Sequence, residues 1–181
     1  MDEAAVKAFF TASMVWFLIS ITGGFFFSLQ FLQHYPFQHT EWLSPGRVRM
    51  VHTNMIAYGF LVSGLVGGLA WAIPRLTGRP LLFHKFTWVL FWVWQAIVLL
   101  TFLGILTGHA QALEWGETPT GFRPNSFNLH DMNWAPVDIL VVVAFLLVSI
   151  HFYTPVILSK SKAMYVSLWY FSAGFVWTAL T

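Results

Sequence analysis

One histidine, His52, stands near the start of a long apolar segment, within the run G-R-V-R-M-V-H-T-N at residues 46–54. An ionisable side chain at membrane depth is costly, so such a residue is a candidate functional site. Arg47 and Arg49 lie about one helical turn before the histidine. Guanidinium groups suit carboxylates because they can donate two parallel hydrogen bonds. A haem, which offers an iron atom to the imidazole and two propionates to the arginines, would satisfy both kinds of residue.

The composition predicts a membrane protein. Hydrophobic residues make up 57% of the 181 residues and charged residues 9%, whereas soluble domains carry about 25% charged residues. We therefore expect an all-α membrane protein, a single transmembrane domain over residues 1–181 that forms a bundle of about five transmembrane helices. The stretches that reach or approach the ~20 residues needed to cross a bilayer are 9–31, 50–73, 86–107, 137–158 and 163–181.

The distribution of charge predicts the orientation. If the helices alternate in direction, one side of the membrane holds six of the nine basic residues: Lys7, Arg75, Arg79, Lys85, Lys160 and Lys162. The other side holds the remaining three, Arg47, Arg49 and Arg123. The positive-inside rule then places the N-terminus in the cytoplasm and His52 near the outer face. The net charge of +2 gives no reason to expect nucleic acid as a partner.

The one long connection, residues 108–135, contains turn-forming residues as well as aromatic and acidic ones. Connections of this length are usually functional or disordered, and the aromatic and acidic content favours a structured outer loop. The chain has no cysteine. This excludes disulfides, thiolate metal sites and haem attached through a Cys-x-x-Cys-His motif.

The face of the second helix that carries His52 is formed by small residues. On a helix, His52, Ile56, Gly59, Ser63 and Gly67 share this face. It would leave room for a flat macrocycle or for a close neighbouring helix, since small residues four apart are also a helix-packing pattern. From these residues alone, a ligand role and a structural role for His52 both remain open.

For the other histidines, the expected depth in the membrane indicates which could share a haem with His52. His109 ends the third helix on the same side as His52, so a haem bound by both is geometrically possible. His151 lies about 20 Å below the outer face at 1.5 Å per residue, and we expect a packed interior residue there. The rest fall in loops or at interfaces, where we expect solvated side chains: His34, His39, His84 and His130.

The run at 46–54 resembles G-R-L-R-P-L-H-T-N at the head of the second helix in the catalytic subunit of haem-copper oxidases, specifically the cbb-type (C-family) oxidases and the related bacterial nitric oxide reductases. Met50 stands where that family has proline. The resemblance covers essentially the whole chain, and the helix II motif is its specific part. Weaker matches occur in the right order: V-K-A-F-F at 6–10, E-W-G-E at 114–117 (similar to the family's E-Y-x-E), P-V-D at 136–138 and Y-V-S-L-W-Y at 165–170.

The resemblance implies roles for individual residues. His52 would be one axial ligand of a low-spin haem b, with Arg47 and Arg49 near its propionates. Glu114 and Glu117 would stand by the propionates of the two haems, with Glu114 a possible calcium ligand. The implied protein is the haem b-binding part of a respiratory terminal oxidase or nitric oxide reductase in a bacterial inner (cytoplasmic) membrane. It would pass electrons from cytochrome c-type subunits toward a binuclear centre.

The family's remaining helices would supply the second axial histidine, the high-spin haem ligand and the histidines that hold copper or non-haem iron. We therefore expect a chain that is not catalytically complete alone, a fragment or split subunit that works with those helices or a second polypeptide. Two alternatives stay open: a stand-alone electron carrier with haem b on His52 and His109, and a haem-free structural subunit. Oxygen and nitric oxide are not distinguished, because the discriminating metal ligands lie outside these residues.

Overall fold

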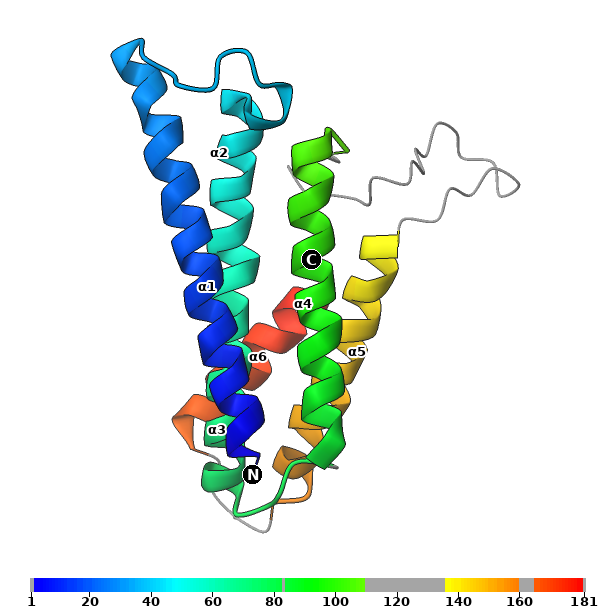
Figure 1. Cartoon of the computed structure of the whole chain (residues 1–181). Coiled ribbons are helices and arrows are strands. Elements are labelled where there is room, and N and C mark those ends of the chain that lie inside the picture. The colour runs from blue at the N-terminus through cyan, green and yellow to red at the C-terminus, as the bar shows by residue number, and fades with distance from the viewer. Residues whose placement is uncertain (1, 83, 110–135, 160–164, 181) are drawn as a thin grey trace, which may run out of the picture.

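The computed structural model describes residues 2–82, 84–109, 136–159 and 165–180, and within these ranges every regular element is a helix (Figure 1). Four helices are long and apolar enough to cross a membrane: Glu3–Leu32, Pro45–Thr77, Lys85–Thr107 and Val137–Ile157. The expected all-α membrane bundle is confirmed. Most of the predicted outer loop, residues 110–135, lies outside the described residues.

Helix α1 (Glu3–Ser28) starts at a side-chain cap. The carboxylate of Asp2 accepts hydrogen bonds of 3.1 Å from the backbone N–H groups of Ala4 and Ala5, which satisfies two otherwise unpaired donors. The helix continues as the short 3₁₀ helix η1 (Leu29–Leu32) and ends at Gln33, whose φ of 55° is left-handed. Another 3₁₀ turn, η2 (Glu41–Leu43), leads into the second long helix.

The second long helix changes its hydrogen-bond pattern midway. It consists of α2 (Pro45–Asn54), the π-helix η3 (Met55–Val62) and α3 (Ser63–Thr77), and it ends at the left-handed Gly78. Two side chains from neighbouring helices bind carbonyl oxygens of η3. Ser13 donates to Phe60 O at 2.8 Å, and the indole of Trp94 donates to Tyr58 O at 3.1 Å.

Successive long helices alternate in direction. Helix α4 (His84–Thr107) runs parallel to α1, whereas α2–η3–α3 and α5 (Pro136–Ile157) run the opposite way (Figure 1). The basic residues Lys7, Arg75, Arg79 and Lys85 therefore share one end of the bundle, as expected, and His52 lies toward the other end.

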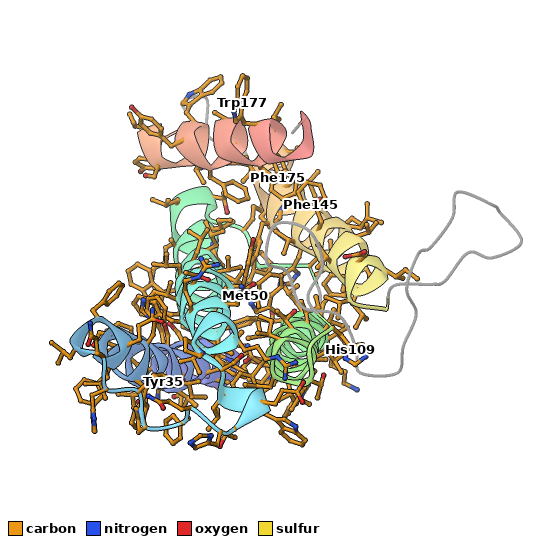
Figure 2. The ribbon with its side chains drawn as sticks, turned by 90° about the horizontal axis from the view of Figure 1, so that it is seen from above. Tyr35, Met50, His109, Phe145, Phe175 and Trp177 are labelled. Carbon is orange, nitrogen blue, oxygen red and sulfur yellow. The ribbon has the colours of Figure 1, made fainter. Side chains whose placement is uncertain are left out.

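Helix α6 (Val166–Leu180) is the counterpart of the fifth expected helix, and it differs from the other four. Its apolar part, Val166–Trp177, is shorter than the four candidate spans. In the view from above, the axis of α6 lies in the plane of the picture, whereas α4 is seen nearly along its axis (Figure 2). It is attached to α5 by aromatic contacts, including stacked rings of Phe145 and Phe175 at 4.4 Å, and by a 3.0 Å hydrogen bond from Tyr153 to Ser172 O.

The small face of the second long helix packs against α1. A Cβ added to Gly59 would lie 2.6 Å from Trp16 Cβ, and one added to Gly67 would lie 2.9 Å from Phe9 Cβ. Of the two explanations for this face, the close neighbouring helix is the one that the structure shows at Gly59 and Gly67.

Candidate functional site

His52 lies in α2 with one edge of its imidazole against α1. Its Nδ1 is 2.8 Å from the carbonyl oxygen of Ser20, a buried residue. Because a carbonyl oxygen can only accept a hydrogen bond, Nδ1 must carry the proton. The hydroxyl of Ser20 lies 3.2 Å from the same nitrogen and donates to the carbonyl of His52 at 2.7 Å. These contacts fix both the ring and its tautomer.

The other ring nitrogen of His52, Nε2, has no hydrogen-bond partner among the described residues. In a neutral imidazole with the proton on Nδ1, the lone pair is on Nε2. Histidines that bind metals almost always donate the opposite N–H to a carbonyl, a carboxylate or water. The half-buried His52 side chain thus has the backbone support on Nδ1 that is typical of metal-ligating histidines.

A glycine on α1, Gly24, allows this close approach. A Cβ at Gly24 would lie 2.7 Å from His52 Nδ1 and 2.8 Å from Cε1, whereas a Cβ at Gly23 would meet nothing nearer than 3.6 Å. The ring of His52 therefore occupies the space that a side chain at position 24 would need. Ser20 and Gly24 were not predicted from the sequence, because no local pattern marks residues of one helix as partners of another.

Arg47 connects the start of α2 to the end of α4. Its Nη1 donates to Leu106 O at 2.9 Å, and its Nη2 forms a 2.9 Å ion pair with Glu41. Leu106 belongs to the last turn of α4, where carbonyls lack helical partners and attract cations. The side chain of Arg47 is 18% exposed and that of Glu41 is 81% exposed, so the pair sits at the surface.

The structure describes only some of the remaining predicted site residues. Arg49 is exposed one turn before His52. His109 follows α4, where Thr107 Oγ1 lies 3.1 Å from its Nδ1, and no hydrogen bond or ring contact joins it to His52. Glu114 and Glu117 lie outside the described residues. In the part of the chain that the structure describes, no three His, Asp or Glu side chains gather as a metal site.

His151 is an interior residue, as its depth predicted. It is fully buried in α5, its Nε2 lies 2.9 Å from the hydroxyl of Thr87, and the rings of Phe86 and Phe152 lie 5.2 and 5.1 Å from its own. Its position among aromatic side chains leaves no room for a large cofactor.

Fold and site together define a helical membrane protein in which Nε2 of His52 has no hydrogen-bond partner among the described residues. The sequence from residue 4 to residue 181 matches the family described as cytochrome c and quinol oxidase polypeptide I, and the chain belongs to this family. That membership confirms the resemblance of the sequence to haem-copper oxidases.

Three relatives show the range of similarity. The chain is 25% identical to the cbb3-type cytochrome c oxidase subunit CcoN1 of Stutzerimonas stutzeri over 177 residues, which are 97% of this chain and 34% of that protein. It is 26% identical to cytochrome c oxidase subunit 1 of Rhodobacter capsulatus over 76% of this chain and 23% of the relative. It is 32% identical to a nitric oxide reductase subunit of Stutzerimonas stutzeri over 58% of this chain and 22% of the relative. In each case the match spans about a third or less of the relative's length.

Proposed function

We propose that this chain forms the haem b-binding part of a respiratory terminal oxidase or nitric oxide reductase catalytic subunit, with His52 as an axial ligand of a low-spin haem. The observation that carries the proposal is the hydrogen bond from His52 Nδ1 to Ser20 O, which leaves Nε2 with its lone pair and without a partner among the described residues. The relatives support it, since they are subunits of cytochrome c oxidases and a nitric oxide reductase.

The residues around His52 fit a haem. A bound haem would take up and pass on single electrons, and its axial ligands and surrounding charge would set its potential. Ser20 would hold the imidazole in the ligating tautomer. Arg49 would face a propionate, and Arg47, now bound to Glu41 and Leu106 O, could share its remaining N–H groups with another. Glu114 and Glu117 would contribute carboxylates near the propionates, Glu114 with a calcium ion.

The rest of the catalytic machinery would come from elsewhere. We propose that the second axial ligand, the high-spin haem and the copper or non-haem iron belong to the helices that the longer relatives have beyond this match, in the same subunit or in a second polypeptide. Cytochrome c-type subunits would deliver the electrons. Whether oxygen or nitric oxide is reduced would be decided by those other helices.

Visible spectra of the complex purified from membranes test the role of His52. We expect His52→Ala to abolish the low-spin b-type spectrum while the protein is still present on an immunoblot. His39→Ala, a change at an exposed histidine of the α1–α2 connection, is the matched control and should leave the spectrum intact. An unchanged spectrum in His52→Ala would refute the assignment.

A second candidate function is a carrier with haem between His52 and His109. It is favoured by the arrangement of two helices, since α2, which contains His52, and the end of α4, which His109 follows, lie toward the same end of the bundle (Figure 1). His109→Ala discriminates: loss of the same spectrum in both single variants supports the carrier, and retention in His109→Ala supports an axial ligand from other helices. A complex that contains no haem at all would leave the haem-free structural role.

We further propose that the N-terminus lies in the cytoplasm of a bacterium whose inner membrane holds the protein. The grouping of Lys7, Arg75, Arg79 and Lys85 at one end of the bundle supports this orientation. Because the chain has no cysteine, the labelling of single introduced cysteines tests this orientation directly. A membrane-impermeant maleimide applied to spheroplasts should label Gln38→Cys and not Glu3→Cys, and the reverse pattern would invert the topology.

A further inference from the structure

A groove of ≈ 520 Å³ lies between α1 and α4 at the end of the bundle that carries the N-terminus. The wall on α1 includes the small residues Ala4, Ala8 and Ala12 together with larger side chains such as Val15, and Phe91 lines the groove from α4. The two helices run side by side and both begin at the lower end of the view in Figure 1. The groove is therefore separate from the His52 site, which lies toward the other end of the bundle.

The groove is closed toward the middle of the membrane. Trp16 Nε1 donates a 2.8 Å hydrogen bond to Gln95 Oε1 and so bridges the two helices. From Ala4 to Trp16 the helix rises about 18 Å, close to half of the ~30 Å hydrocarbon thickness. A transmembrane helix, about 10–12 Å wide, would need a path along the whole bundle. A recess that stops at mid-membrane matches one acyl chain of one leaflet.

The open end of the groove carries positive charge. Lys7 lines it, is exposed, and has no ion-pair partner in the described ranges, although Glu3 is one helical turn away. Asp2 and Glu3 at the start of α1 are acidic, whereas Arg75, Arg79 and Lys85 add three basic residues at the same end of the bundle, so that this end is basic overall. A lysine at the membrane surface attracts anionic lipid headgroups.

We propose that this groove binds one anionic phospholipid of the leaflet on the N-terminal side, with an acyl chain along Ala8 and Ala12 and its phosphate beside Lys7. The binding site is independent of the haem proposal, since the lipid contacts α1 and α4 on a face that His52 does not reach.

Native mass spectrometry of the intact complex in mild detergent tests this site. The complex is incubated with phosphatidylglycerol or phosphatidylcholine, and retained lipids are counted. We expect preferential retention of one phosphatidylglycerol, loss of that lipid in the groove-filling Ala8→Leu/Ala12→Leu variant, and about five-fold weaker retention in Lys7→Gln. Arg79→Gln, which removes a charge from the α3–α4 connection at the same end, is the control and should bind like the unchanged complex.

A photoreactive benzophenone amino acid at Thr11, which also lines the groove, identifies the occupant in native membranes. Attachment of a phospholipid mass to the chain supports the proposal. Attachment of another polypeptide would overturn it, as would equal lipid retention by Lys7→Gln and the unchanged complex. Lys7→Gln changes an exposed side chain only, so the test does not depend on the folding of the double variant. The low-spin spectrum serves as an independent readout and should be the same in all of these variants.

Discussion

The two ends of the bundle each hold a histidine, and the two rings are bound in opposite ways. Near the end that carries Arg47, His52 uses Nδ1 to donate to a backbone carbonyl of α1 and keeps Nε2 open. Toward the N-terminal end, the fully buried His151 uses Nε2 for the hydroxyl of Thr87 and lies among phenylalanine rings. The contrast shows that depth in an apolar helix does not make a histidine a ligand. What matters is which nitrogen the neighbouring helix occupies and whether the other one can be reached.

The largest expected effect is a loss of stability when His151, toward the N-terminal end of the bundle, is replaced. His151→Ala would empty a site enclosed by Phe86, Phe152 and Thr87 and should cost about 2–5 kcal/mol of unfolding free energy, as other large-to-small core changes do. Thermal denaturation of the purified complex measures it. The haem spectrum of the surviving protein should be unchanged, and a loss of haem without loss of stability would contradict the structural role.

At the other end, Gly24→Ala should act on the cofactor. The new Cβ would lie 2.7 Å from His52 Nδ1, so the ring must leave its hydrogen bond to Ser20. Disturbed support of a metal ligand typically costs about 10- to 100-fold in affinity, and we expect a corresponding loss of low-spin haem per polypeptide. Gly23→Ala is the matched control, because its Cβ meets only ordinary contacts. Equal haem content in Gly24→Ala and Gly23→Ala would contradict the proposal that His52, unlike His151, is a cofactor ligand held by α1.

Tyr35 tests the connection between α1 and α2 at the His52 end. This buried tyrosine donates a hydrogen bond to Leu43 O, and burial raises its pKa from the ordinary value of 10.0. The contribution of Tyr35 to the free energy of unfolding should be complete below pH 10. It should decline as the pH rises through the folded-state pKa, because the unfolded chain ionises first.

Tyr35→Phe should therefore cost about 1 kcal/mol at neutral pH and show a weaker loss of stability at alkaline pH. Denaturation midpoints at neutral pH and through the alkaline range measure both effects. Tyr170→Phe, at an exposed position of α6, is the control. A steeper alkaline loss in Tyr35→Phe than in the control would contradict the assignment.

A milder change separates the two groups of Ser20 that contact His52. Ser20→Ala removes the hydroxyl that donates to His52 O but keeps the carbonyl that accepts from Nδ1. Interhelical hydrogen bonds in membranes average about 0.6 kcal/mol, so we expect a small drop in thermal stability and full haem content. Complete haem loss in this variant would show that the hydroxyl, not the carbonyl, holds the ring.

Much of the fold could be predicted from the sequence, since hydropathy acts along the chain. Four of the five expected helices were confirmed as candidate spans, with the second starting at Pro45 rather than near residue 50. The π-helix Met55–Val62 was not predicted, because its widened turns are accompanied by contacts from Ser13 and Trp94 on other helices. Helix α6 was expected to be one more membrane span, but its axis crosses the direction of α4 and its apolar part is shorter than the four candidate spans.

The amino-acid sequence was enough to establish an apolar helical bundle and to select His52, with two arginines before it, as the candidate cofactor residue. Composition and the 46–54 motif are local, and the cost of burying charge in a bilayer applies before any helices meet. The three-dimensional arrangement was needed to show that the small face below His52 packs on α1 and that Ser20, 32 residues away, binds Nδ1. It was also needed to show that Trp16 and Gln95, 79 residues apart, close a groove. Such contacts depend on how separate helices meet, which no spacing within one helix specifies.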